Sequence, residues 1–254
     1  MSEQSVIHLL ARHNYKDAIR ILAENGYDID SKYEKGKTPL HVALEYDNEN
    51  VALYLIENGA DIHAECNGKE RPLHIAVREG FIEIINFLIN RGAGVNEREY
   101  YGYTPLHYAS YYGHLEVAEL LLKNKANIKA INNHGETPLY TAIEHRNYSI
   151  AKLLLENGAN INAINNYGQT PLRVAVTGNN LKAVQFLVDN GANVNSKDER
   201  GNTVLNYAEY AGHTEIAELL KEAMKQQENE VSLLPDAAPL IKAAMKKQQE
   251  NTDE

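Results

Sequence analysis

The sequence has no tryptophan and only one cysteine, Cys66, in 254 residues. A single thiol cannot close an internal disulfide or supply a cysteine-based zinc site, so we expect stability to come from packing. Chains without disulfides are typical of reducing compartments, which favours a cytoplasmic or otherwise intracellular protein. The sequence leaves open whether the protein is delivered into a host cell.

Long apolar runs and long basic runs are also missing. No stretch approaches the roughly 18 consecutive apolar residues that span a bilayer, and the start, Met1–Gln4, lacks the pattern of a signal peptide. The formal net charge is -10 and no basic run is longer than Lys246-Lys247, which disfavours binding to a phosphate backbone. We therefore expect a soluble protein that neither inserts into a membrane nor binds nucleic acid.

The chain contains an internal repeat with a period of 33 residues. A Thr-Pro-Leu-His motif, or a variant of it, begins at Thr38, Arg71, Thr104, Thr137, Thr170 and Thr203. A second motif, Asn-Gly-Ala or a variant, keeps the same period and begins at Asn58, Arg91, Asn124, Asn157 and Asn190. Two motifs in phase indicate tandem units without insertions.

These motifs and this period resemble the ankyrin-repeat family, over about residues 2–224. The resemblance implies an all-α fold with short β-hairpins, in which helix-turn-helix units stack into a solenoid. It also implies that partners bind in a concave groove, formed by hairpin tips and the exposed ends of the first helices.

Local signals in the fourth unit support this fold. Thr104 suits the N-cap of a first helix that starts with Pro105, where the missing N–H of proline costs nothing. Gly113 is expected to end that helix. A second helix with a wide apolar face is predicted over Leu115 to Lys123.

The ends of the array depart from the repeat pattern, as the ends of a solenoid must. We expect an N-terminal capping repeat at 2–32, five full repeats at 33–197, a C-terminal capping repeat at 198–224 and a tail at 225–254. Within the tail, Asp236 can cap an amphipathic helix over about 237–249. This helix is expected to seal the last repeat; the alternatives are a docking helix for another protein and a mobile tail.

The histidines do not indicate catalysis. His41, His74 and His107 belong to the Thr-Pro-Leu-His turns, where the ring is expected to bond the backbone or the threonine hydroxyl. His134 and His145 should face the groove beside Glu144, but two histidines without a third ligand make a poor zinc site. Phosphate loops, nucleophile elbows and metal-binding helix motifs are missing from the sequence. We expect a non-enzyme without a cofactor or a bound metal.

The positions that usually contact a partner in ankyrin proteins are all tyrosine in the fourth unit. They are Tyr100, Tyr101, Tyr103, Tyr111 and Tyr112. The corresponding candidates in other units are Tyr46, Arg78, Glu79, His134, Glu144, His145 and Tyr167. An aromatic centre with a charged rim is typical of a protein interface. The alternative interpretation is that the tyrosines pack on one another or reflect an AT-rich genome.

The leading hypothesis is a monomeric, non-enzymatic scaffold that binds one protein or extended peptide in the groove. The main alternative is a two-ended adaptor, in which the tail helix recruits a second protein, with a host-directed effector as one version. The weakest hypothesis is a metal-dependent or small-molecule-binding protein that uses His134 and His145.

Overall fold

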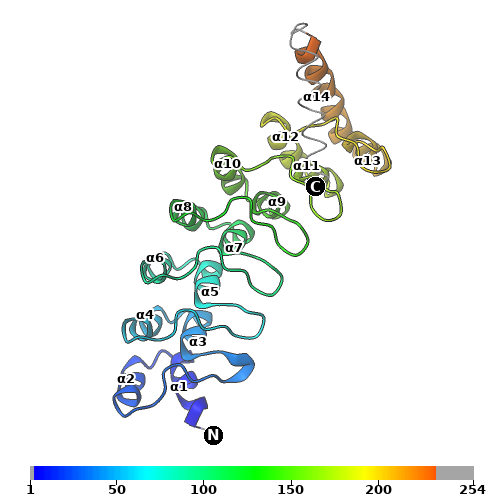
Figure 1. Ribbon diagram of the computed structural model, residues 1–254. Helices are drawn as coiled ribbons and strands as arrows, with labels where there is room; N and C mark the ends of the chain where they lie inside the picture. The colour runs from blue at the N-terminus through cyan, green and yellow to red at the C-terminus, as the bar shows by residue number, and fades with distance from the viewer. Residues whose placement is uncertain (1–2, 233–254) are drawn as a thin grey trace. The chain divides into compact units, whose positions relative to one another are not determined.

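The computed structural model describes residues 3–232, and every regular element in them is a helix (Figure 1). The α-helices are α1 (Glu3–Arg12), α2 (Lys16–Glu24), α3 (Pro39–Glu45), α4 (Glu49–Glu57), α5 (Pro72–Glu79), α6 (Ile82–Asn90), α7 (Pro105–Tyr112), α8 (Leu115–Lys123), α9 (Pro138–Glu144), α10 (Tyr148–Glu156), α11 (Pro171–Thr177), α12 (Leu181–Asp189), α13 (Val204–Tyr210) and α14 (Thr214–Ser232). A short 3-10 helix, η1 (Glu34–Gly36), lies in the loop before α3. The tail helix predicted over 237–249 lies outside the described residues.

Backbone contacts divide the chain into two units, Met1–Asn133 and His134–Glu254, and each is described by itself. In the first unit, α1, α3, α5 and α7 pack side by side as one layer, and α2, α4, α6 and α8 form a second layer (Figure 1). Each first-layer helix also packs on the helix that follows it in the chain. The first unit is therefore a stack of four helix pairs.

The second unit repeats the same plan with three helix pairs. Here α9, α11 and α13 form the first layer, and each packs on its following helix, α10, α12 or α14. The last helix, α14, also contacts α12, its neighbour in the second layer. Each unit therefore buries its apolar side chains between layers and between successive pairs.

The fourth unit of the repeat shows how the sequence sets the helix ends. Helix α7 begins at Pro105 after the capping residue Thr104, and it ends at Gly113, whose φ of 82° is left-handed. Helix α8 runs over Leu115–Lys123, and Val117, Ala118 and Leu121 are its buried residues. Their spacing along the chain places all three side chains on one face. Both helices predicted in this unit are confirmed.

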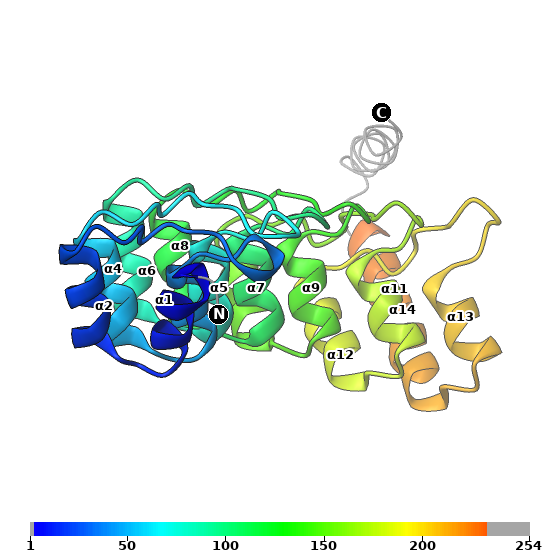
Figure 2. The same ribbon diagram turned by 90° about the horizontal axis from the view of Figure 1, so that it is seen from below.

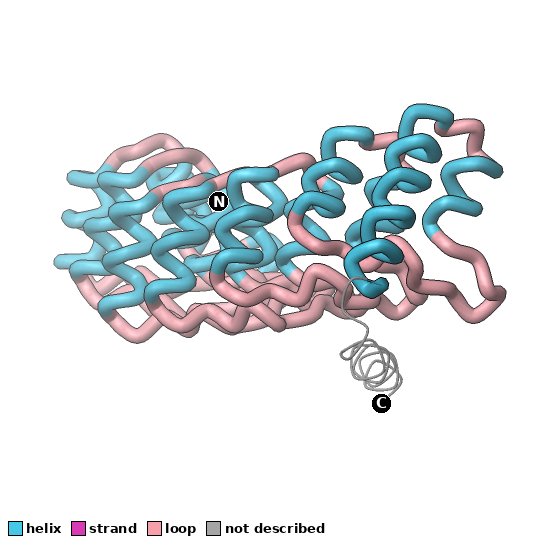
Figure 3. Tube along the Cα trace, turned by 90° about the horizontal axis from the view of Figure 1, so that it is seen from above, coloured by secondary structure: helices cyan, strands magenta, loops and turns pink. Residues whose placement is uncertain are grey.

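The loops between pairs carry turns without strands in the part of the chain that the structure describes (Figure 3). A single antiparallel bridge pairs Tyr33 with Lys37. The loop before α7 closes in a similar way, because the Glu99 N–H donates to the Tyr103 carbonyl at 3.1 Å. The all-α class is confirmed, and these turns stand where the short hairpins were expected.

Successive loops of the first unit are also joined to each other. The Asn67 N–H donates to the Lys35 carbonyl, the Tyr100 N–H to the Gly68 carbonyl and the Asn133 N–H to the Tyr101 carbonyl, at 2.6, 2.7 and 2.9 Å. Figure 2 shows the loops gathered along one side of the helices. Each loop is therefore held by its own helix pair and by the next loop.

Cys66 lies in one of these loops and is buried, at 7% exposure. Burial raises the pKa of its thiol, which disfavours the reactive thiolate form.

Candidate interaction surface

Histidines fix the starts of first-layer helices in the first unit. The Nδ1 atom of His41 accepts the Thr38 backbone N–H at 3.2 Å, so Nε2 carries the hydrogen and donates to the Glu70 carbonyl at 3.3 Å. His74 and His107 hold the equivalent position at the starts of α5 and α7. Burial lowers the pKa of His41 and of His74 to about 4, so both rings are neutral at pH 7. The predicted structural role of these histidines is confirmed.

His114 has a structural role too. Its Nε2 lies 2.9 Å from the Arg78 carbonyl, at the end of the preceding first-layer helix. The ring fills the space beside Gly80, where an added Cβ would come within 3.1 Å of the imidazole. This contact fixes the end of α7 against the end of α5.

Aromatic rings form a connected group around α7. Tyr108 is the central member, with its ring centroid 6.1 Å from that of Tyr103 and 6.2 Å from that of Tyr112. The Tyr112 ring lies 4.8 Å from the Tyr111 ring and stacks on His114 at 6.3 Å. Edge-to-face and offset arrangements at these separations are favourable. The rings therefore fix one another in place.

Sequence reasoning missed Tyr108, because its repeat position is not among those that usually contact a partner in ankyrin proteins. One signal was available: Tyr108 precedes Tyr112 by four residues, and such pairs lie together on a helix. It joins the side chains of Tyr103 and Tyr112, which come from the loop and from the end of the helix.

Two further tyrosines lie at the tip of the loop before α7. Tyr100 and Tyr101 are 64% and 60% exposed, and their rings meet edge to face at 5.2 Å. The next residue, Gly102, has a φ of 82°, and a Cβ there would lie 2.8 Å from the Asn133 nitrogen. Glycine is therefore required for this tip to approach the following loop. We call the six side chains of Tyr100, Tyr101, Tyr103, Tyr108, Tyr111 and Tyr112 the tyrosine surface.

The tyrosine surface is electrically neutral near pH 7. Burial is the main cause that raises the pKa of Tyr108 and of Tyr112 above that of an ordinary tyrosine. Their hydroxyls stay protonated and can both donate and accept hydrogen bonds. Tyr111 and Tyr112 keep 43% and 46% of their surface exposed. The surface therefore offers ring faces and hydroxyl groups together.

Charged groups beside the tyrosine surface are paired within the protein. The Arg78 guanidinium lies between two carboxylates, with Nη1 at 2.7 Å from Glu70 and Nε at 2.8 Å from Glu79. Lys37 and Glu45 form a second pair, with Nζ at 2.6 Å from Oε2. Each pair joins the residue before the helix cap to the end of the helix, eight residues on. Arg78 and Glu79, which the sequence proposed for a partner, are bound to each other.

Tyr46, at the end of α3, is the other aromatic candidate of the first unit. It is 45% exposed, and the Arg12 guanidinium carbon lies 4.6 Å from its ring centroid. One face of the ring is therefore covered by a cation from α1.

The candidates of the second unit form two groups of their own. His134 and Tyr167 stack with ring centroids 6.2 Å apart, and His134 Nδ1 lies 3.2 Å from the Tyr167 hydroxyl. Glu144 and His145 are neighbours at the end of α9, with His145 Nε2 3.8 Å from a Glu144 carboxylate oxygen. Burial and then the nearby Glu136 carboxylate raise the pKa of Glu144. Burial lowers the pKa of His145.

The structure gives the metal hypothesis for His134 and His145 no support. Within residues 3–232, no group of three or more histidine, cysteine, aspartate or glutamate side chains is arranged to hold a metal ion. No helix among them is both long enough and apolar enough to cross a bilayer.

Stacked helix pairs joined by turns, with an exposed aromatic surface, define a helical repeat protein. The family model for ankyrin repeats in three copies matches residues 2–66, 63–132, 128–198 and 158–231. These matches cover most of the chain, so the chain belongs to the ankyrin-repeat family. Ankyrin-repeat domains are generally scaffolds for protein–protein interaction and are typically non-catalytic.

A solved structure is similar over most of its length. The crystal structure of the human ASB11 ankyrin repeat domain matches with a TM-score of 0.72 and 29% sequence identity, over 80% of this chain and 91% of that chain. No curated protein matches the sequence. The resemblance read from the repeat motifs is confirmed by both the family model and this structure.

Proposed function

We propose that the first unit binds a segment of another protein, an extended peptide included, through the tyrosine surface. The observation that supports this proposal is the exposure of Tyr100, Tyr101, Tyr111 and Tyr112 within one unit of the repeat. The positions of Tyr111 and Tyr112 are occupied in the preceding unit by Arg78 and Glu79, whose charged side chains are paired with each other. The end of α7 therefore differs from the end of α5 in the chemistry of its side chains.

Aromatic burial is the main source of affinity in this proposal. A tyrosine buries about 150 to 250 Å² when fully covered, and it freezes only two side-chain torsions on binding. The stacking of Tyr112 on Tyr108 has already ordered that ring. Because Arg78 is neutralised by Glu70 and Glu79, a partner gains little from charge here. We expect contacts through ring faces and hydroxyl groups.

The experiment compares full-length chains in affinity capture followed by titration of each captured protein. The test variant combines Tyr111→Ala with Tyr112→Ala, and we expect the affinity of a specific partner to fall more than tenfold. The matched control combines Glu34→Ala with Lys35→Ala, which lie in the loop before α3 at the edge of the array. Its affinity should stay within about threefold of the parent.

A second variant distinguishes a loss of binding from a loss of structure. Tyr112 stacks on His114, so its removal can also loosen the end of α7. Tyr100→Ala with Tyr101→Ala removes two rings that are more than half exposed and should leave the melting temperature nearly unchanged. If both tyrosine variants fold and retain full affinity, the partner binds elsewhere and the proposal is wrong.

A further inference from the structure

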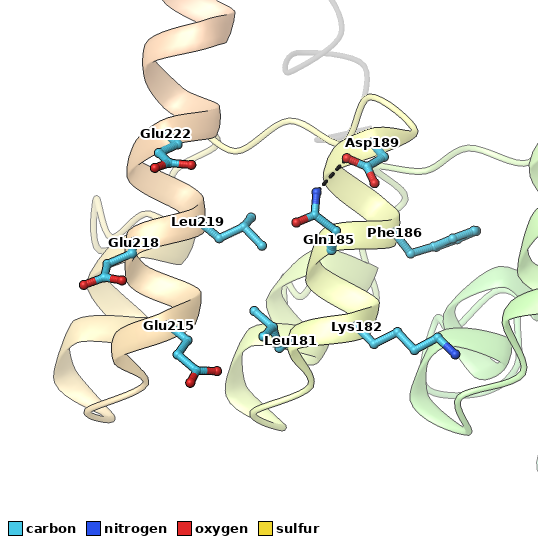
Figure 4. Close-up of a pocket in the computed structure, with 9 residues that line it drawn as sticks. All are labelled: Leu181, Lys182, Gln185, Phe186, Asp189, Glu215, Glu218, Leu219 and Glu222. Atoms are coloured by element: carbon cyan, nitrogen blue, oxygen red, sulfur yellow. Dashed lines mark hydrogen bonds between the residues drawn. The ribbon is translucent and has the colours of Figure 1, made fainter.

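A groove of about 760 Å³ lies between α12 and α14 in the second unit (Figure 4). Leu181 of α12 and Leu219 of α14 project into the gap between the two helices. Leu181 is 39% exposed, close to the 37% of Ile82 at the same repeat position of the first unit. The groove therefore has an apolar floor that no described residue covers.

The walls of this groove are acidic. Its lining carboxylates belong to Asp189, Glu215, Glu218 and Glu222. The lining cation, Lys182, instead reaches the Tyr148 ring, with Nζ 4.9 Å from the ring centroid. Among the residues that the structure describes, these four carboxylates make no ion pair. The groove therefore combines leucine side chains with uncompensated negative charge, which suits an amphipathic helix with a basic rim.

The chain itself carries such a segment at 237–249. It has three lysines, Lys242, Lys246 and Lys247, and no acidic residue. At helical spacing, its apolar residues Leu240, Ile241, Ala244 and Met245 fall on one stripe. Lys247 lies at one edge of that stripe, Lys242 lies beyond its other edge, and Lys246 lies on the far side of the helix. Lys247 would meet carboxylates if the stripe faced the groove.

The connection is long enough for this segment to return along α14. Helix α14 ends at Ser232, and residues 233–236 can span about 13 Å, more than the 8 to 10 Å between packed helices. A helix over 237–249 is about 20 Å long, which equals the rise along α14 from Ser232 back to Leu219. Its basic end would therefore reach the level of Glu222 and Glu218.

We propose that residues 237–249 fold back as a helix along α14 and enter the groove between α12 and α14 with their C-terminal half, with Met245 toward Leu219 and Lys247 beside Glu222. The occupant is this chain's own tail. The binding role of the tyrosine surface does not depend on this docking, because the two lie in different units.

Carbodiimide cross-linking of the full-length protein tests the occupant directly. The reagent joins lysine to carboxylate only where they are in contact, and peptide mass spectrometry identifies the joined pairs. We expect links from Lys247 to Glu218 or Glu222. A mixture of isotope-labelled and unlabelled protein separates links within a chain from links between chains. Links between chains, or links from the tail to other surfaces, would overturn the proposal.

Hydrogen exchange with charge reversal tests the pairing. Lys246→Glu with Lys247→Glu should raise amide exchange in 181–189 and 214–222 about threefold or more, because the new carboxylates repel the groove. Adding Glu218→Lys with Glu222→Lys should restore protection. The control, Lys123→Glu with Lys129→Glu, makes the same charge change in the first unit and should leave these amides unaffected. Unchanged exchange in the tail variant, or no rescue by the reversed groove, contradicts the docking.

Discussion

Tyr111 and Tyr112 of the first unit stand at the same repeat positions as Glu144 and His145 of the second, 33 residues further on. The helices that carry them, α7 and α9, begin with the same Thr-Pro-Leu motif and pack in the same layer of their units. In the first unit these positions give a neutral aromatic surface; in the second, a carboxylate whose pKa is raised by burial and by a like charge. The same type of helix therefore carries side chains of different chemistry at these positions.

The residue before the helix cap shows the same contrast. Lys37 pairs with Glu45, and Glu70 pairs with Arg78, so the first unit satisfies these charges internally with either polarity. At the equivalent positions of the second unit, Glu136 and Glu144 are both acidic. Internal pairing therefore leaves the tyrosines of the first unit as its dominant surface feature, whereas the second unit keeps excess negative charge at these positions.

The largest effect should fall on the buried scaffold that the two units share. Leu121→Ala in α8 should lower the free energy of unfolding by about 2 to 5 kcal/mol, because the leucine is fully buried and its removal leaves a cavity. Leu154→Ala, at the equivalent position of α10, should cost a similar amount. Denaturant titration measures both, with Glu119→Gln as a surface control that should cost less than about 0.5 kcal/mol. A small effect at either leucine would show that the units are not built alike.

Acidic pH should destabilise the first unit more than the second. His41 and His74 have pKa values of about 4 in the folded protein, below the ordinary value of 6.5, so the unfolded chain binds more protons between these limits. Their contribution to stability is complete above pH 6.5 and is lost as the pH falls toward 4. Near pH 5 the loss should be about 1 to 2 kcal/mol per histidine. Tyr140 and Arg173 replace histidine in the second unit, so hydrogen exchange should rise first in the first unit.

His41→Asn supplies the matched variant for this prediction. Asn206 already caps α13 in the same way, accepting the Thr203 N–H at 2.8 Å. Replacing His41 should therefore reduce the difference in unfolding free energy between pH 7 and pH 5, even if stability at pH 7 falls. Burial raises the pKa of Glu70, so its contribution to stability increases as the pH falls, opposite to that of the histidines. Glu70 is unchanged in this variant. If the difference in unfolding free energy between pH 7 and pH 5 does not change, His41 is not a source of the acid sensitivity.

The smallest effect concerns charge pairing in the second unit. Glu144→Lys would give Glu136 an opposite charge at the position that Arg78 occupies relative to Glu70. We expect a gain of about 0.2 to 1 kcal/mol in stability, lost in high salt because the pair is half exposed. Thermal melting at low and high salt measures it, and Glu144→Gln separates the removal of repulsion from the gain of attraction. A salt-independent change would show that charge is not the cause.

The sequence predicted the scaffold well because each of its determinants is local. Thr104, Pro105 and Gly113 set the bounds of α7 through capping and backbone conformation, and the roles of His41 and His114 follow from their places beside these ends. The division of the chain at Asn133 was not predictable, since the 33-residue period continues across it without insertion.

The candidate surface was predictable in position but not in contacts. The five tyrosine positions follow from the repeat register, and whether they bind a partner stays a prediction. The pairing of Arg78 with Glu70 and Glu79 depends on side-chain rotamers, which a periodic pattern does not specify. Tyr108 was missed for a different reason, because its repeat position is not among the usual contact positions, although its ring lies 6.1 Å from that of Tyr103.

The bonds between successive loops have an entropic consequence for binding. The Tyr100 N–H is held by the Gly68 carbonyl and the Tyr101 carbonyl by the Asn133 N–H, so the backbone on both sides of the exposed pair is already fixed. Ordering a residue costs roughly 1 to 2 kcal/mol of conformational entropy, and here folding has met that cost before any partner arrives. An incoming segment has only its own freedom to lose, so weak individual ring contacts can add up to a measurable affinity.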